Sequence, residues 1–361
     1  MKIIYKLLFL FLLTIGYSSC DFLDIVPDEI TTEADAFKDR NAAKNFVYSC
    51  YGYLPQSNVA SGSLDLLTGD EVITAFEHET FASFPKGNYT ASSPVISYWN
   101  TFFQGLRQCY IFLENVDKVP DLTESVKTDY IAQVKFLIAY YHYQLARCYG
   151  PIILIKELPD VNASQAEYLP RTSYDECVDW ICNLLDEAAS SLPAIRTNKE
   201  DYGLATSVGA KAVKAKMLLY AASPLFNGNS SFYSNFTDKS GSQLMPLTYD
   251  PNKWVKAKTA IKEAIDLAEQ NGHALYVKQD YKIGNEDANP YPAAGPVRCL
   301  RTSLVDWDSR NPEVLLAETR SEGSYGIQNK SLPFVTDGWA WNGVGPTWTM
   351  LNRFYTKNGL P

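Results

Sequence analysis

The sequence predicts a mainly α-helical protein, built as a degenerate array of helix pairs like tetratricopeptide repeats, with a loop-rich irregular subdomain and a few short strands. Two observations support this fold class. Segments with apolar residues at spacings of three and four recur in pairs, whereas residues 276–350 are rich in Gly, Pro, Asn and Trp. We expect a helical-repeat scaffold over about residues 33–275, followed by a loop-rich region over about 276–350.

The strongest helical pattern lies in residues 133–149. Its apolar side chains recur at the spacing of one helical face, at Val134, Leu137, Ile138, Tyr141 and Leu145. Gly150 is expected to end this helix. An upstream helix is expected from Tyr98 to Val116, and either Asp121 or Thr123 can cap the helix that follows. Two helices joined by so short a link are expected to pack antiparallel.

The same pairing recurs further along the chain. Thr172 or Ser173 can cap a helix that Pro193 stops, and residues 205–219 form its partner. A further helix is expected from Pro251 to an Asn-Gly stop at residues 271–272. The partner helix carries small residues that let a neighbour approach closely, namely Ala210, Ala212, Ala215, Ala221 and Ala222.

Three stretches are too long for ordinary repeat linkers: Leu66–Val95, Asn227–Thr248 and Tyr276–Met350. Loops of this length are usually functional. Within the last of them, Glu313–Glu318 has the character of a strand.

Residues 1–19 have the features of a secretory signal peptide. Lys2 and Lys6 precede an apolar run, Leu7–Ile15, that is too short to span a membrane. Small residues then lead into Cys20, an arrangement that resembles the bacterial lipobox, in which this cysteine becomes lipid-modified. We therefore expect lipidation at Cys20 and a mature chain over 20–361. Plain secretion and an uncleaved anchor are the alternatives.

The charge balance argues against a nucleic-acid-binding protein, and the positions of the cysteines favour buried thiols. The chain has 32 basic and 41 acidic residues, a net charge of −9, and no long basic run, so no nucleic-acid partner is expected. Six cysteines follow Cys20, and most lie in predicted helices. We expect buried thiols there, although disulfides are possible outside the cytoplasm.

Catalytic and metal-binding motifs were sought and not found. The three histidines, His78, His142 and His273, form no hydrolase or zinc motif, and His142 is expected in the core or between helices. Asp306, Asp308 and Glu313 hint at a calcium site, but they lack the ligand order of an EF-hand. We expect no metal and no cofactor.

Several segments together resemble the SusD/RagB family of outer-membrane nutrient-binding lipoproteins. They are CDFLDIVP, YWNTFFQGLRQCYIFLENV, KFLIAYYHYQLARCYGPIIL, LPRTSYDECVDWICNLLDEAASSLP, GAKAVKAKMLLYAASPLF, NPEVLLAETR and GPTWTMLNRFY, which span nearly the whole chain. Because members of this family commonly run well past the last motif, we expect a C-terminal portion beyond Pro361.

The resemblance implies a lipid-anchored protein on the outer-membrane surface of a Gram-negative bacterium. Such a protein would capture an oligosaccharide or polysaccharide and deliver it to a SusC-like TonB-dependent transporter, without being an enzyme. Three alternatives stay open: a lipoprotein glycosidase, a structural or adhesin protein, and a peptide-binding member of the same family.

A glycan site pairs flat aromatic rings with hydrogen-bonding side chains. The long loops supply the predicted stacking rings Trp307, Tyr325, Trp339 and Trp341. They also supply the predicted neighbours Asp70, His78, Tyr89 and Asn342. For each Trp the alternative is that it anchors its own loop to the scaffold, and the segment around His78 can be a solvated charged loop. Trp99 and Trp348 lie beside helix starts, where a core position is expected.

Overall fold

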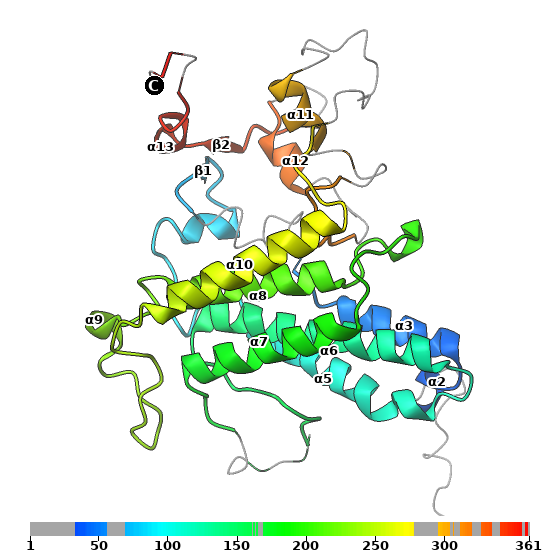
Figure 1. The fold of residues 1–361 in the computed structure, drawn as a ribbon. Helices are drawn as coiled ribbons and strands as arrows, with labels where there is room; N and C mark the ends of the chain where they lie inside the picture. The colour runs from blue at the N-terminus through cyan, green and yellow to red at the C-terminus, as the bar shows by residue number, and fades with distance from the viewer. Residues whose placement is uncertain are drawn as a thin grey trace, which may run out of the picture.

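The computed structural model describes residues 33–55, 69–160, 162, 164, 169–277, 295–303, 306, 311–319, 326–333, 340–355 and 358–359. Cys20 and the predicted signal peptide lie outside these residues. The fold is mainly helical, as predicted (Figure 1). The elements are α2 (Glu33–Ala36), α3 (Arg40–Tyr51), β1 (Val72–Thr74), η2 (Thr80–Ser83), α5 (Trp99–Asn115), η3 (Val116–Lys118), α6 (Glu124–Tyr149), α7 (Tyr174–Ser191), η5 (Lys199–Asp201), α8 (Ser207–Ala222), α9 (Ser230–Tyr233), α10 (Asn252–Gln270), α11 (Pro296–Ser303), α12 (Gly326–Ser331), β2 (Val344–Pro346) and α13 (Trp348–Leu351).

The long helices form an array in which each packs against the next. α5 contacts α6, α6 contacts α7, α7 contacts α8, and α8 contacts α10, while α3 lies against α5 and α6 (Figure 1). This order of neighbours is the one expected for stacked helix pairs. The predicted array is therefore confirmed, and it forms the scaffold from which the loops project.

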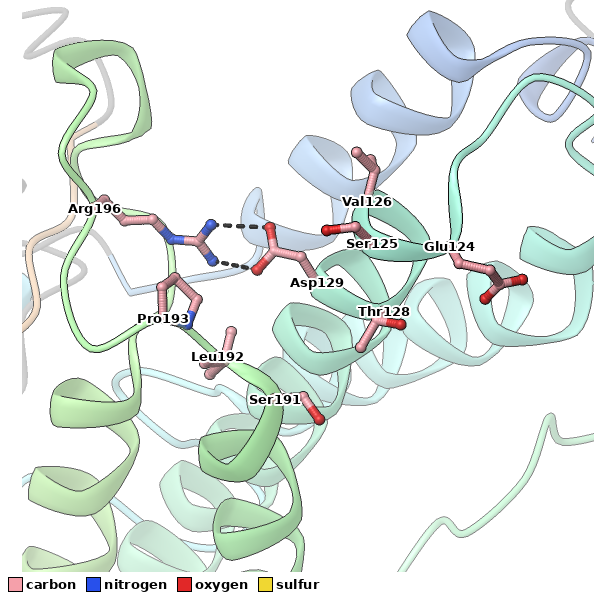
Figure 2. A pocket seen from close by; sticks show the side chains of 9 residues that line it. All are labelled: Glu124, Ser125, Val126, Thr128, Asp129, Ser191, Leu192, Pro193 and Arg196. Atoms are coloured by element: carbon pink, nitrogen blue, oxygen red, sulfur yellow. Dashed lines mark hydrogen bonds and ion pairs between the residues drawn. The ribbon is translucent and has the colours of Figure 1, made fainter.

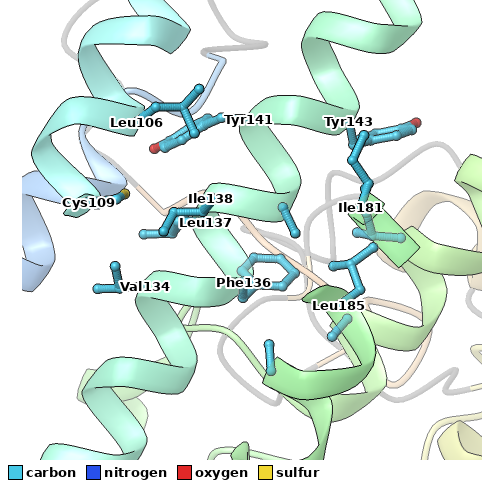
Figure 3. Packing of buried hydrophobic residues seen from close by; sticks show 14 of the residues in the cluster. Leu106, Cys109, Val134, Phe136, Leu137, Ile138, Tyr141, Tyr143, Ile181 and Leu185 are labelled. Atoms are coloured by element: carbon cyan, nitrogen blue, oxygen red, sulfur yellow. The ribbon is translucent and has the colours of Figure 1, made fainter. Parts of the chain in front are cut away.

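α6 is the central helix of the core. Figure 3 shows Leu106 and Cys109 of α5 on one side of it and Ile181 and Leu185 of α7 on the other. Because α6 is enclosed from both sides, almost every residue from Ala132 to Ala146 is buried. A helix that is buried all round needs apolar residues beyond a single stripe, as its sequence has.

The predicted helix boundaries agree with the local chemistry. Thr123 caps α6, because its Oγ1 accepts a hydrogen bond from the Val126 N–H at 3.4 Å. Gly150 ends α6 with φ +71°, a conformation that favours glycine. The other candidate cap, Asp121, instead accepts a hydrogen bond from the Arg40 N–H at 2.7 Å, at the start of α3.

Small residues bring α8 and α10 together. Ala215 of α8 is buried against Ala260 and Ala264 of α10. The remaining buried positions on α10 are also alanines, at 257 and 268. The prediction that α8 accepts a close neighbour is confirmed.

One predicted strand is wrong. Glu313–Glu318 forms a turn followed by irregular chain, and the Val314 N–H donates to the Asn311 carbonyl at 3.2 Å. A strand needs a neighbour to pair with, but Leu316 packs against the helical core instead.

The six cysteines among the described residues are free thiols, as predicted. Cys50, Cys109, Cys177 and Cys182 are buried in the array. Burial raises the pKa of Cys177 to about 11, so this residue stays protonated and behaves as a small apolar side chain. In the described part of the chain, no helix has an apolar stretch long enough to cross a membrane.

Candidate functional site

Two segments far apart in the sequence meet in a small antiparallel sheet. The paired residues are Val72 with Pro346, Ile73 with Gly345, and Thr74 with Val344. Phe81 of η2 is buried against Val72 and Val344 and forms a small core separate from that of the array. We call this part of the molecule the platform, and it comprises residues 69–90, 326–333 and 340–355.

An ion pair and backbone hydrogen bonds join α12 to the rest of the platform. Lys330 Nζ binds the Glu79 carboxylate, and both side chains are largely buried. The Trp341 N–H donates to the Asn329 carbonyl at 2.8 Å, and the Gly343 N–H donates to the Lys330 carbonyl at 2.7 Å. These contacts fix the chain just before β2 against the end of α12.

Gly343 lets an aromatic ring approach the backbone. A Cβ atom at this position would lie 2.0 Å from Phe76 Cε2, so no other residue fits without moving the ring. The His78 ring stacks on Phe76, with ring centres 5.4 Å apart and planes at 24°. His78 thereby lies beside the segment that carries Trp341 and Asn342.

Four of the predicted site residues lie at the two ends of the ladder of paired residues between β1 and β2. His78, Trp341 and Asn342 lie at the end where Thr74 pairs with Val344, and the Trp341 side chain is 42% exposed. Asp70 lies at the other end, where its carbonyl accepts a hydrogen bond from Thr347 Oγ1 at 2.6 Å. Because a strand rises about 3.3 Å per residue, the three-residue ladder is roughly 7 Å long, and Asp70 and Trp341 lie beyond its opposite ends.

The remaining predicted residues divide into two groups. Tyr89 is exposed, and its ring lies 5.2 Å from that of Phe84, which follows η2. Trp307, Tyr325 and Trp339 lie outside the described residues. The structure therefore brings three of the predicted residues to one end of the ladder, with Asp70 at the other.

The expectation that Trp348 is a core residue is wrong, because its side chain is 79% exposed. α13 has only four residues, none of them buried, so this helix presents the Trp348 ring to the surface. Phe354 and Tyr355 are exposed just beyond it. Sequence spacing could place Trp348 and Leu351 on one helical face, but it could not show that both side chains are exposed in the described part of the chain. Trp99 does pack against the core, as predicted.

These side chains are suited to binding. Trp341 and Trp348 offer flat apolar faces, and His78, Asn342 and Asp70 offer hydrogen-bonding groups at both ends of the ladder. His78 is 77% exposed and lies 3.6 Å from Glu79, whose carboxylate is already held by Lys330.

The sequence matches a family profile described as starch-binding proteins that associate with the outer membrane, over residues 21–219. This match covers more than half of the chain. The chain belongs to the SusD-like family. The matched residues include most of the helical array and the β1 half of the platform, but not the β2 half.

Solved structures of SusD-like proteins have the same fold. The protein BT4246 is 30% identical, with a TM-score of 0.75, over 89% of this chain and 58% of that chain. A SusD-like protein from Bacteroides fragilis, BF3747, has a TM-score of 0.67 at 19% identity, over 95% of this chain and 57% of that chain. SusD-like protein P25 of Formosa agariphila is 23% identical over 60% of this chain and 43% of its own length. The chain thus spans about half the length of these relatives.

A hollow of this SusD-like chain lies away from the platform. Figure 2 shows this hollow, of about 630 Å³, beside the first turns of α6 and the segment after α7. Asp129 and Arg196 form a paired ion bridge in it, with N–O distances of 2.8 and 2.9 Å. None of the nine residues that line the hollow is aromatic, and Asp129 and Arg196 already bind each other. The hollow therefore suits a sugar less well than the platform does.

The titratable groups that the sequence singled out elsewhere have structural roles. His142 is buried, with Nδ1 2.8 Å from the Ile138 carbonyl and Nε2 accepting from the Ile155 N–H at 3.1 Å. Asp306 accepts a hydrogen bond from the Tyr276 hydroxyl at 2.7 Å, and Glu313 accepts one from the Tyr276 N–H at 2.9 Å. Asp308 lies outside the described residues. Among the described residues, no cluster of three or more His, Cys, Asp or Glu side chains could hold a metal ion.

Proposed function

We propose that this protein is a surface-exposed lipoprotein that captures oligosaccharides and delivers them to a TonB-dependent transporter in the outer membrane. The observation that carries the proposal is the platform, where Asn342 follows the exposed Trp341 and His78 stacks on Phe76, the ring that lies against Gly343. The starch-binding description of the SusD-like family supports the same ligand class.

The chemistry required is binding alone. The C–H face of a sugar ring stacks on an aromatic ring, and its hydroxyls exchange hydrogen bonds with amide, imidazole and carboxylate groups. Trp341 supplies the ring, and Asn342 and His78 supply the polar groups, while Asp70 can reach a neighbouring sugar unit. Since no bond is broken, the site needs neither a shifted pKa nor a nucleophile.

The arrangement at the membrane follows the family resemblance. Lipidation at Cys20 would tether the chain to the outer membrane, and the helical array would provide a broad face for the transporter. Handover then requires only that the captured glycan dissociate toward the transporter.

The site assignment is tested by replacing single tryptophans. Trp341→Ala is expected to weaken oligosaccharide binding at least tenfold, because one lost stacking contact costs about 1.4 kcal/mol or more. Trp254→Ala is the matched control, since Trp254 is also 42% exposed but lies on α10, outside the platform. Binding is measured by calorimetry, and circular dichroism checks that both variants fold. Equal affinities for the two variants would refute the site.

A further inference from the structure

Two buried cysteines face each other between α3 and α5. Cys50 and Cys109 are both fully buried in the core of the array, and Figure 3 shows Cys109 on its helix there. The Cys50 thiol is the hydrogen-bonding neighbour of the Cys109 thiol. The structure holds both residues as free thiols. Their position makes them candidates for a bond that would join the two helices.

Contacts on both sides of the cysteines set the register of α3 against α5. Three pairs of residues mark this register: Phe46 with Phe112, Ser49 with Gln108, and Tyr53 with Gly105. The residue numbers rise along one segment as they fall along the other, so the two run antiparallel. In this register position 50 lies opposite positions 108 and 109. Cys50 and Cys109 therefore meet because of how the two helices pack.

The two helices approach closely at this point. Gly105 lies one turn before Cys109 on α5, and a Cβ atom there would be 3.0 Å from the Tyr53 Cβ. Gln108 Nε2 donates to Ser49 Oγ at 3.1 Å, which ties together the residues that precede the two cysteines. A disulfide needs two Cβ atoms within about 4.5 Å of each other. The spacing of the helices is thus suited to a disulfide.

The other two fully enclosed cysteines have different neighbours. Cys177 Sγ donates to the Ile152 carbonyl at 3.8 Å and to the Thr172 carbonyl at 3.5 Å. Cys182 lies five residues further along α7, and a spacing of five does not place two side chains on one helical face. Of these four buried cysteines, the packing brings together the pair between α3 and α5.

This pair is unreactive once α3 is docked. Burial raises the pKa of Cys109, and the neighbouring Cys50 thiol adds to the shift. A protonated thiol is a poor nucleophile. The buried face of α3 consists only of Ala43, Val47 and Cys50, so this helix is held by few side chains. Reaction is therefore expected while α3 is undocked during folding, and the docked helix then shields the bond from reductants.

We propose that Cys50 and Cys109 form a disulfide that joins α3 to α5 when the chain folds in an oxidising compartment. The thiolate of one cysteine attacks a disulfide oxidant, such as oxidised glutathione or a thiol–disulfide oxidoreductase, and releases one thiol. The second cysteine attacks the mixed disulfide and releases the second thiol. The cysteine pair loses two electrons and two protons, and the oxidant gains them. In the cell this reaction depends on export, which is part of the proposed function.

Thiol counting after refolding tests the bond. The chain from Asp21 onward contains six cysteines, and it is unfolded in reductant and refolded in reduced and oxidised glutathione. Alkylation in denaturant and mass spectrometry then count the free thiols. Four are expected, with Cys50 and Cys109 in one crosslinked peptide, whereas refolding in reductant should leave six. Six free thiols in both buffers, glutathione adducts alone, or a bond between other cysteines would overturn the proposal.

Single substitutions provide the matched controls. In glutathione, Cys50→Ala should keep all five remaining thiols free, whereas Cys182→Ala, at another buried position, should still lose two. A disulfide restricts the unfolded chain, so the oxidised unsubstituted protein should unfold at a higher urea concentration than the reduced protein. This difference should vanish in Cys50→Ala. If it persists there, the bond between α3 and α5 is not its cause and the proposal fails.

Oligosaccharide affinity separates this inference from the proposed function. The platform has a core separate from that of the array, so the oxidised and reduced forms are expected to bind glycan equally well. If the crosslink forms but neither form binds glycan, the proposed function fails and the disulfide stands. If both forms bind glycan but the crosslink is absent, the disulfide is overturned.

Discussion

Gly343 has no side chain, and the ring of Phe76 occupies the space where one would lie. His78 stacks on Phe76, so this contact links His78 to the segment that carries Trp341 and Asn342. A single glycine therefore positions the polar and aromatic groups of the candidate site relative to one another. His142, by contrast, lies in the helical core and outside the candidate site. Its hydrogen bonds, to the backbone of residues 138 and 155, support the fold.

Gly343→Ala is expected to displace Phe76 and to weaken oligosaccharide binding at least tenfold. Thermal unfolding of the array should change little, because the platform has a small core of its own. Gly345→Ala is the matched control, since nothing lies within 4 Å of a Cβ added at this neighbouring strand position. Calorimetry and thermal melts of both variants provide the comparison. A Gly343→Ala protein that binds as well as Gly345→Ala would show that this packing does not shape the site.

The stability of the array should fall in mild acid because of His142. Burial lowers the pKa of His142 to about 4, from 6.5 in an unfolded chain, although its bond to the Ile138 carbonyl opposes the shift. Below pH 6.5 the unfolded chain takes up a proton that the folded chain refuses until about pH 4, so folding is weakened across this window. The expected loss is about 3 kcal/mol. Urea unfolding between pH 7 and pH 4 should show a smaller loss for His142→Gln, and identical pH profiles would contradict this explanation.

Among the elements, those with a long periodic pattern could be predicted and those that depend on distant partners could not. α5, α6, α7, α8 and α10 lie where apolar spacing and stop signals place them. α3 was not predicted, because its buried face consists only of Ala43, Val47 and Cys50, too weak a pattern without knowledge of α5 and α6. β2 has the sequence Val-Gly-Pro, which disfavours a strand and forms one only because β1 lies alongside it.

The close packing of α8 on α10 makes a prediction at the level of elements. Ala264→Leu is expected to destabilise the array by about 1–3 kcal/mol, because the extra atoms must enter the tightly packed contact with Ala215. Glu269→Leu, at an exposed position on the same helix, should change stability by less than about 0.5 kcal/mol. Chemical denaturation of the two variants tests the difference. If Ala264→Leu leaves the free energy of unfolding unchanged, α10 is free to shift on α8.

In the whole molecule, the helical array and the platform are parts of one chain with separate hydrophobic cores. The platform is built from residues 69–90, 326–333 and 340–355, and the array from α3, α5, α6, α7, α8 and α10 (Figure 1). The sequence could predict the helical scaffold and several exposed rings, because periodicity and loop composition are local properties. It could not predict that residues 72–74 pair with residues 344–346, because such long-range pairing leaves no local signal. The division near residue 275 and lipidation at Cys20 stay predictions.

The central claim is glycan capture without cleavage, and one screen tests it most directly. The protein from Asp21 onward is presented to a glycan array, and each sugar that binds is then titrated by calorimetry and checked for chain length by mass spectrometry. We expect saturable binding of at least one oligosaccharide class, sugars recovered intact, and loss of binding in Trp341→Ala. A folded protein that binds no sugar, or one that shortens the sugars it binds, would contradict it.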